Sequence, residues 1–195
     1  VIPQAERRLT AFHEAGHAIA AHELPGQDPV HQITIVPRGQ AGGMTISLPE
    51  EDRSYLSKRY MEDEIVALLG GRAAEELMLG DISTGASNDI EQATKLARAM
   101  VTRYGMTDEF DMVAMETVTN QYLGGDTSLA CSADTQKEID KKVVETVKAQ
   151  HEKARRLLAE HRSKLDELAK YLYEKETITG SEFMKILQDK EGAAK

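Results

Sequence analysis

The segment from Glu6 to Leu24 restricts the fold of this chain more than any other, because its pattern is helical. Its apolar positions recur at spacings of three and four residues, which is the repeat of one helical face; they are Leu9, Phe12, Gly16 and Ile19. Pro3 suits the entrance of such a helix, and Pro25-Gly26 ends it. The sequence therefore predicts one long helix near its start.

The sequence His13-Glu-Ala-Gly-His17 lies inside this predicted helix. Residues four apart share a helical face, so both imidazoles can reach one metal ion. Glu14 lies about 100° around the helix from His13, where its carboxylate can sit beside a metal-bound water. Zinc lowers the pKa of such a water toward ~7, and Glu14 would take up the proton and return it to a leaving amine. Gly16 would leave room beside the metal.

A catalytic zinc ion needs a third protein ligand besides two histidines. An extended motif would place Gly and His three and six residues after His17, but Ala20 and Glu23 stand there. The remaining histidines are expected on the surface; they are His22, His31, His151 and His161. The alternative for His13 and His17 themselves is a salt-linked histidine cluster on the surface of a helix.

Carboxylates therefore remain as candidates for the third ligand. Glu75 and Glu76 lie in a predicted helix, and Asp89 lies where a loop meets the next helix. Asp89 could equally be an ordinary helix-start residue that interacts with the helix dipole. From the physics of the sequence alone, Asp89 and Glu75 are nearly equal candidates.

Composition excludes several other classes of function. The chain of 195 residues is 41% hydrophobic, enough for one core or two closely packed subdomains. Its formal net charge of −9, without a concentrated basic face, argues against nucleic-acid binding. The single cysteine, Cys131, excludes an internal disulfide and a cysteine-rich zinc site, and it is expected to be a small residue that precedes a helix.

The rest of the chain predicts a small β element on a helical body. Residues 31–36 and 44–48 alternate like strands on either side of a turn-rich segment, 37–43. A helix is expected from Ser57 to Leu79, where Gly70-Gly71 would permit close backbone packing.

The second half is expected to be helical except for residues 106–131, which look irregular, with a turn at 124–126. Capping boxes are predicted for three pairs, and they are Asn88 with Glu91, Ser163 with Asp166, and Thr179 with Glu182. The first would open a helix that ends at Gly105, and the last a helix to about Leu187. Apolar residues from Ile139 to Leu172 recur at near-heptad spacing, with a break expected near His161.

Three segments together resemble the peptidase domain of FtsH, a family of membrane-anchored, ATP-dependent zinc metalloproteases of bacteria, mitochondria and chloroplasts. They are His13-Glu-Ala-Gly-His17, Gly70-Gly-Arg-Ala-Ala-Glu-Glu76 and Ser83-Thr-Gly-Ala-Ser-Asn-Asp89. The resemblance extends from about Arg7 to about Leu187. It implies a mainly α fold, in which a zincin-type active-site helix and a small β-sheet precede a C-terminal helical bundle. We expect one zinc peptidase domain over 1–195, with a metal-site subdomain at about 6–130 and a helical subdomain at about 132–189.

The resemblance also implies roles for individual residues. Asp89 would be the third zinc ligand, and Glu75 would orient a ligand imidazole. The segment Gly43-Met44-Thr45-Ile46-Ser47 would be an edge strand that binds the backbone of a polypeptide substrate, although it could also be an ordinary hairpin strand. One Zn²⁺ per chain is expected, with Glu14 as the general base and acid of peptide hydrolysis.

The family further implies a homohexamer, an ATPase module in cis and an N-terminal membrane anchor. The peptidase domain would lie on the cytoplasmic, or organelle matrix or stromal, side and take part in processive degradation of membrane and soluble proteins. This chain has no G-x-x-x-x-G-K-[ST] loop, no membrane-length apolar run, no signal peptide and no initiating Met. We therefore expect an excised, soluble piece that does not respond to ATP by itself.

Two other functions compete with peptide hydrolysis. The domain could be a catalytically silent, zinc-containing module that holds an ATPase ring together, although a silent site need not keep Glu14. It could also be a helical interaction domain without metal. Zinc content and peptidase activity separate these alternatives.

Overall fold

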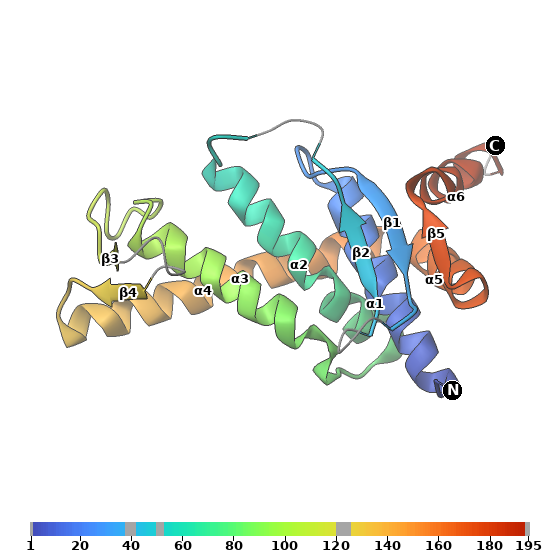
Figure 1. The fold of residues 1–195 in the computed structure, drawn as a ribbon, viewed down its shortest axis with the longest axis horizontal. Coiled ribbons are helices and arrows are strands. Elements are labelled where there is room, and N and C mark those ends of the chain that lie inside the picture. Colours follow the sequence, from blue (N-terminus) through green and yellow to red (C-terminus); the bar gives the residue numbers. More distant parts are fainter. Residues whose placement is uncertain (1, 38–41, 50–52, 120–125, 194–195) are drawn as a thin grey trace.

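The computed structural model describes residues 2–37, 42–49, 53–119 and 126–193, and most of these residues are helical (Figure 1). The helices are α1 (Gln4–Glu23), α2 (Lys58–Leu79), the 3₁₀ turn η1 (Thr84–Ala86), α3 (Ser87–Thr102), α4 (Ala133–Glu160), α5 (Arg162–Lys175) and α6 (Gly180–Ala193). The predicted mainly α fold is confirmed. None of the helices in these ranges is both long and apolar enough to cross a membrane.

A three-stranded antiparallel sheet lies beside α1. Its strands are β1 (Val30–Thr34), β2 (Met44–Ser47) and β5 (Thr177–Thr179), in the order β2-β1-β5. The first two strands were predicted; β5 was not, because three residues are too few to show a period of two. The predicted turn between β1 and β2 lies partly outside the described residues. In the described part of the chain, β2 pairs with β1 alone and is an edge strand.

Residues 106–131 are less irregular than predicted. Two short strands, β3 (Glu116–Thr119) and β4 (Asp126–Leu129), pair there as an antiparallel hairpin beside the N-terminal end of α4 (Figure 1). The turn expected at 124–126 lies mostly outside the described residues. Cys131 is half-buried and packs against a hydrophobic cluster of α2, α3 and α4, as expected for a small structural residue.

Helices α1 and α2 cross at glycines. A Cβ atom on Gly16 would lie 2.5 Å from the carbonyl oxygen of Gly70, and one on Gly70 would lie 2.9 Å from that of Gly16. Gly16 therefore permits the helix crossing, and the prediction that it leaves room beside a metal is wrong. The predicted close backbone packing is confirmed for Gly70, whereas Gly71 faces the imidazole of His13.

The helix ends test the capping predictions. Thr179 and Glu182 form the predicted reciprocal capping box, since each side chain accepts a hydrogen bond from the other's backbone N–H, at 3.2 and 3.3 Å. The box predicted at Asn88 is wrong, because η1 leads directly into α3 and the helix begins at Ser87 without a side-chain cap. The break between α4 and α5 lies at His161 as predicted, but α5 begins at Arg162, so Ser163 lies inside it.

Candidate metal centre

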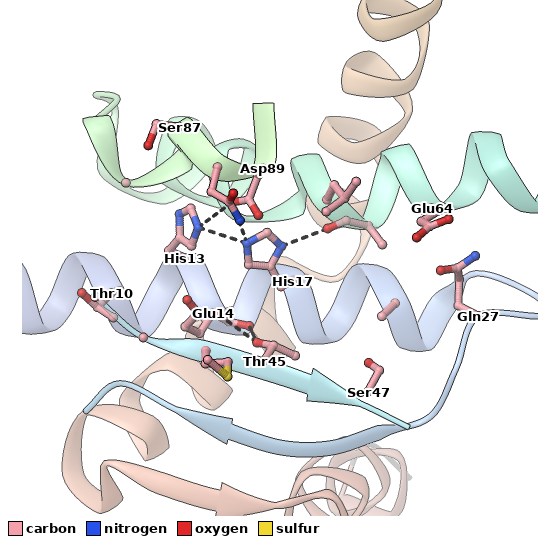
Figure 2. A pocket seen from close by; sticks show the side chains of 18 of the residues that line it. Thr10, His13, Glu14, His17, Gln27, Thr45, Ser47, Glu64, Ser87 and Asp89 are labelled. Atoms are coloured by element: carbon pink, nitrogen blue, oxygen red, sulfur yellow. Dashed lines mark hydrogen bonds and ion pairs between the residues drawn. The ribbon is translucent and has the colours of Figure 1, made fainter. Parts of the chain in front are cut away.

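His13, His17 and Asp89 meet at one point, although Asp89 is 76 residues from His13 along the chain. The Nε2 atoms of His13 and His17 lie 3.0 Å apart. The Oδ2 atom of Asp89 lies 3.2 Å from the first nitrogen and 3.1 Å from the second. Figure 2 shows the two imidazoles on α1 facing the Asp89 carboxylate in the first turn of α3. Three side chains therefore direct one atom each to a common centre.

The other nitrogen of each imidazole is already engaged. Nδ1 of His13 lies 2.7 Å from Oε2 of Glu75, and Nδ1 of His17 lies 2.9 Å from the carbonyl oxygen of Ala67. Both partners are acceptors, so each Nδ1 carries the proton and donates it. The lone pair of each neutral imidazole is then on Nε2, which faces the common centre.

When both imidazoles are neutral, the three converging atoms are all acceptors, and a cation between them would relieve their mutual repulsion. In a tetrahedral site with Zn–N bonds of about 2.0–2.1 Å, two ligand atoms lie about 3.3 Å apart. The observed separations of 3.0–3.2 Å are close to this value. Two imidazoles and one carboxylate are also a donor set that zinc accepts. The residues present therefore fit a zinc ion.

The ionisation of the cluster reflects the same convergence. Burial alone would lower the pKa of His13, but hydrogen bonds with Asp89 and Glu75 raise it to about 9. Burial would raise the pKa of Asp89, but its contacts with the two imidazoles hold that pKa well below its usual range. The pKa of Glu75 is also lowered, by His13 and Ser83, against the effect of its burial. Without a metal, the cluster thus holds a proton firmly.

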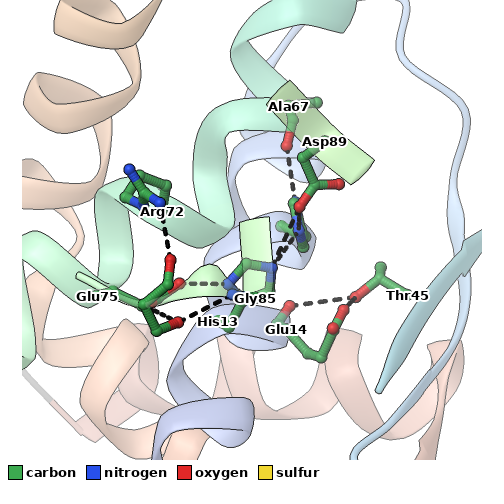
Figure 3. Close-up of polar contacts among 10 residues, drawn as sticks. His13, Glu14, Thr45, Ala67, Arg72, Glu75, Gly85 and Asp89 are labelled. Carbon is green, nitrogen blue, oxygen red and sulfur yellow. Dashed lines mark hydrogen bonds and ion pairs between the residues drawn. The ribbon is translucent and has the colours of Figure 1, made fainter. Parts of the chain in front are cut away.

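A polar chain fixes Glu75 and the loop before Asp89 (Figure 3). The Ser83 hydroxyl donates a hydrogen bond to Oε1 of Glu75, whose other oxygen accepts from His13. Arg72 donates to the carbonyl oxygen of Ser83 at 2.7 Å. A Cβ on Gly71 would lie 2.4 Å from Nε2 of His13, so only glycine leaves space for the ring. The roles of Ser83 and Arg72 were not predicted from the sequence, and Gly71 was predicted only to permit close packing of the backbone.

Glu14 lies beside the cluster and not in it. Its side chain is 6% exposed, and its Oε1 accepts a hydrogen bond of 3.0 Å from the Thr45 hydroxyl on β2. Both residues line a cleft of about 800 Å³ that contains the three candidate ligands and the segment from Gly43 to Thr45. Figure 2 shows β2 running along this cleft beside α1.

The remaining histidines lie away from the cleft. His22 and His31 are exposed, and the ring of His22 packs edge-on against Phe183. His151 pairs with Glu76 at 2.7 Å, and His161 pairs with Glu23 at 3.3 Å. They make ordinary surface contacts, as the sequence predicted, and Glu76 points away from the metal centre.

Comparison with known proteins decides the family. The model of peptidase family M41 matches residues 1–186. The chain belongs to peptidase family M41. Among its relatives in this family, proteins named ATP-dependent zinc metalloprotease FtsH are 48% identical over 191 residues in Clostridium perfringens and 49% identical over 189 residues in Lancefieldella parvula. A protein of the same name from Thermus thermophilus is 44% identical over 188 residues.

These alignments cover 97%, 96% and 96% of this chain, but only 27%, 29% and 30% of the three relatives. The chain therefore spans less than a third of the length of these M41 proteins. The resemblance to FtsH drawn from the three sequence motifs is confirmed at the level of the family.

Proposed function

We propose that this chain is the peptidase part of an ATP-dependent zinc metalloprotease and that His13, His17 and Asp89 hold one Zn²⁺. The observation that carries the proposal is the triangle of three acceptor atoms at 3.0–3.2 Å, with each Nδ1 donating elsewhere. Glu75 is a positioning residue for His13, because its buried carboxylate accepts the Nδ1 proton and thereby fixes the tautomer and the ring.

The reaction is hydrolysis of a peptide bond in a polypeptide substrate. Zinc, when bound, supplies a Lewis acid that activates water and polarises the scissile carbonyl. Glu14 accepts the proton of the attacking water and delivers it to the leaving amine, which is the work of a general base and acid. Its buried carboxylate beside the ligand triangle, with the cleft open in front of it, supports this role.

The strand β2 binds the substrate backbone. It has a neighbour on one side only within the described sheet, so its free side offers N–H and C=O groups to an extended peptide. Binding through backbone groups is largely independent of sequence, which suits a protease that degrades many proteins. The segment proposed for this contact remains Gly43 to Ser47.

The ATP-dependent part of the function belongs to regions that the relatives have and this chain does not span. We propose that an ATPase module in cis delivers unfolded polypeptide to the cleft, in a homohexamer held at a membrane by an N-terminal anchor. The peptidase domain then lies on the cytoplasmic, or organelle matrix or stromal, side. Processive degradation of membrane and soluble proteins follows from this arrangement.

The replacement Glu14→Gln tests the reaction. In the complete natural protein that contains these residues, casein turnover should fall by about a hundredfold or more, because general acid–base catalysis contributes about 10²–10⁴-fold. Zinc content should stay at one ion per chain. Undiminished turnover would remove Glu14 from the mechanism, and zinc binding without any turnover in the unmodified protein would favour the silent assembly module instead.

The choice of third ligand has its own test. Asp89→Ala should abolish stoichiometric zinc binding, because only two imidazoles remain. Glu75→Ala should weaken zinc binding but retain it when zinc is in excess. Full zinc occupancy in Asp89→Ala would show that the ligand assignment is wrong.

A further inference from the structure

We propose that Thr45 is a positioning residue that holds the Glu14 carboxylate in its working orientation and so couples the substrate-binding strand to the general base. The inference rests on the proposed role of Glu14. It assigns to the Thr45 side chain a function separate from the backbone contacts proposed for β2.

The Thr45 hydroxyl lies 3.0 Å from Oε1 of Glu14 and 3.2 Å from the backbone carbonyl oxygen of the same residue (Figure 3). A hydroxyl has one proton and can donate it to one acceptor at a time. The carboxylate is the stronger acceptor because it is charged, and its hydrogen bonds are about twice as strong as those between neutral groups. The hydroxyl of Thr45 therefore donates its proton to the Glu14 carboxylate.

The stem of Glu14 is packed, but its carboxylate has few polar contacts among the described residues. Within the described part of the chain, Thr45 is the one residue with a hydrogen bond to the Glu14 carboxylate. A glutamate side chain has three rotatable bonds, and a general base must stay within hydrogen-bond reach of the proton that it abstracts. Without its partner, the buried carboxylate would turn toward solvent or toward the metal ligands.

The strand presents Thr45 rigidly. Thr45 is paired with Ile33, which is fully buried, so both side chains lie on the face of the sheet that packs on α1. Its β-branched side chain has restricted χ1 freedom, which keeps the hydroxyl oriented toward the Glu14 carboxylate. Just before it, a Cβ on Gly43 would lie 3.1 Å from Cγ of Glu14, so the strand lies directly against the stem of the glutamate.

This arrangement predicts a specific kinetic effect. Thr45→Val keeps the size and the β-branching but removes the hydroxyl. A hydrogen bond to a charged group corresponds to about ten- to a hundredfold in rate. We expect kcat to fall by about that factor in the complete natural protein, while KM for a short unfolded peptide and the zinc content stay unchanged. Thr45→Ser, which keeps the hydroxyl, should retain most of the activity.

A second readout does not depend on activity. Crystals of the metal-free Thr45→Val protein should show the Glu14 carboxylate turned from its wild-type position or in more than one rotamer. The wild-type protein and Thr45→Ser should show one orientation. This comparison shows whether the fall in kcat comes from a misoriented Glu14 carboxylate.

Four outcomes would overturn the inference: unchanged kcat in Thr45→Val, an equal loss in Thr45→Ser, a rise in KM without a fall in kcat, or an unmoved Glu14 carboxylate in the crystals. Glu14→Gln is measured in parallel. If Glu14→Gln is inactive and Thr45→Val is normal, only the role of Thr45 fails. If Glu14→Gln is active, the proposed function fails as well.

Discussion

Helix α1 packs on α2 and on α5 in two different ways. Toward α2 it uses glycine and alanine, and the groups buried at that crossing include His13 and Glu75. Its large apolar residues Phe12 and Ile19 instead belong to a hydrophobic cluster that contains the fully buried leucines of α5. The first contact brings backbones close together, whereas the second buries large apolar side chains.

The two contacts therefore contribute differently, one to the stability of the domain and the other to the geometry of the metal centre. Burial of aliphatic side chains stabilises the domain without directing any polar atom. Close approach of α1 and α2 brings His13 within 2.7 Å of Glu75, where it orients a metal ligand. Changes on the α5 side should therefore affect stability alone, and changes on the α2 side should affect metal binding as well.

The largest effect on stability is expected on the α5 side. Leu165 is 0% exposed, and Leu165→Ala should lower the free energy of unfolding by about 2–5 kcal/mol, because a buried side chain is lost and a cavity is left. Urea unfolding of the metal-free protein measures this. The zinc affinity of the folded variant should not change, and a large loss of affinity would contradict the separation. Val144→Ala, at a position 57% exposed, is the control and should change stability by less than about 0.5 kcal/mol.

The next largest effect is expected at the helix crossing. In an uncrowded helix, Gly→Ala stabilises a protein by about 0.5–1 kcal/mol. A Cβ at Gly16 would meet the Gly70 carbonyl oxygen at 2.5 Å, so Gly16→Ala should instead destabilise by about 1–3 kcal/mol. It should also weaken zinc binding, because α1 carries both histidines. Urea unfolding and zinc titration of the same sample test both effects. A more stable variant would contradict the claim that the crossing of α1 and α2 requires glycine at this position.

A third prediction isolates the metal centre from the packing around it. Glu75→Gln keeps the size of the side chain but replaces the charged acceptor for His13, and zinc affinity should fall by about 10–100-fold. Glu76→Gln is a matched control, because Glu76 is adjacent to Glu75 but its carboxylate pairs with His151 and Arg155. Competition with a chelating dye measures both affinities. Equal losses in the two variants would exclude a specific role for Glu75.

The smallest expected effect is the release of protons when zinc binds. The pKa of His13 is raised to about 9 without metal, so this imidazole is protonated at pH 7.5 and zinc must displace the proton. At least one proton should be released per zinc ion, because the pKa of His17 is raised as well by its hydrogen bond with Asp89, and affinity should rise at least about tenfold per pH unit up to about pH 9. Calorimetric titrations in two buffers with different ionisation enthalpies count the protons. Binding without proton release would contradict the raised pKa.

The sequence was sufficient for features that depend on local spacing. The period of α1, the placement of His13 and His17 on one face, and the Thr179–Glu182 capping box all depend on residues within a few positions of each other. The strand β5 escaped prediction because three residues carry no period, and the capping box at Asn88 was wrong because η1 precedes the helix directly.

The sequence was insufficient for contacts between distant segments. From the physics of the sequence alone, Asp89 and Glu75 were nearly equal candidates as ligands, and only the resemblance to FtsH favoured Asp89. Glu75 then proved to face Nδ1 of His13, and Asp89 to face both Nε2 atoms. No local pattern reveals which side of an imidazole a carboxylate reaches across 62 or 76 residues. The contact of Thr45 with Glu14 was hidden for the same reason.

The most direct test of the central claim is anomalous diffraction at the zinc absorption edge, from crystals grown with one equivalent of zinc. We predict a single peak per chain, bonded to Nε2 of His13, Nε2 of His17 and a carboxylate oxygen of Asp89, with the Glu14 carboxylate nearby but not bonded. No peak at this position, or a peak that is bonded to Glu75 in place of Asp89, would contradict the account.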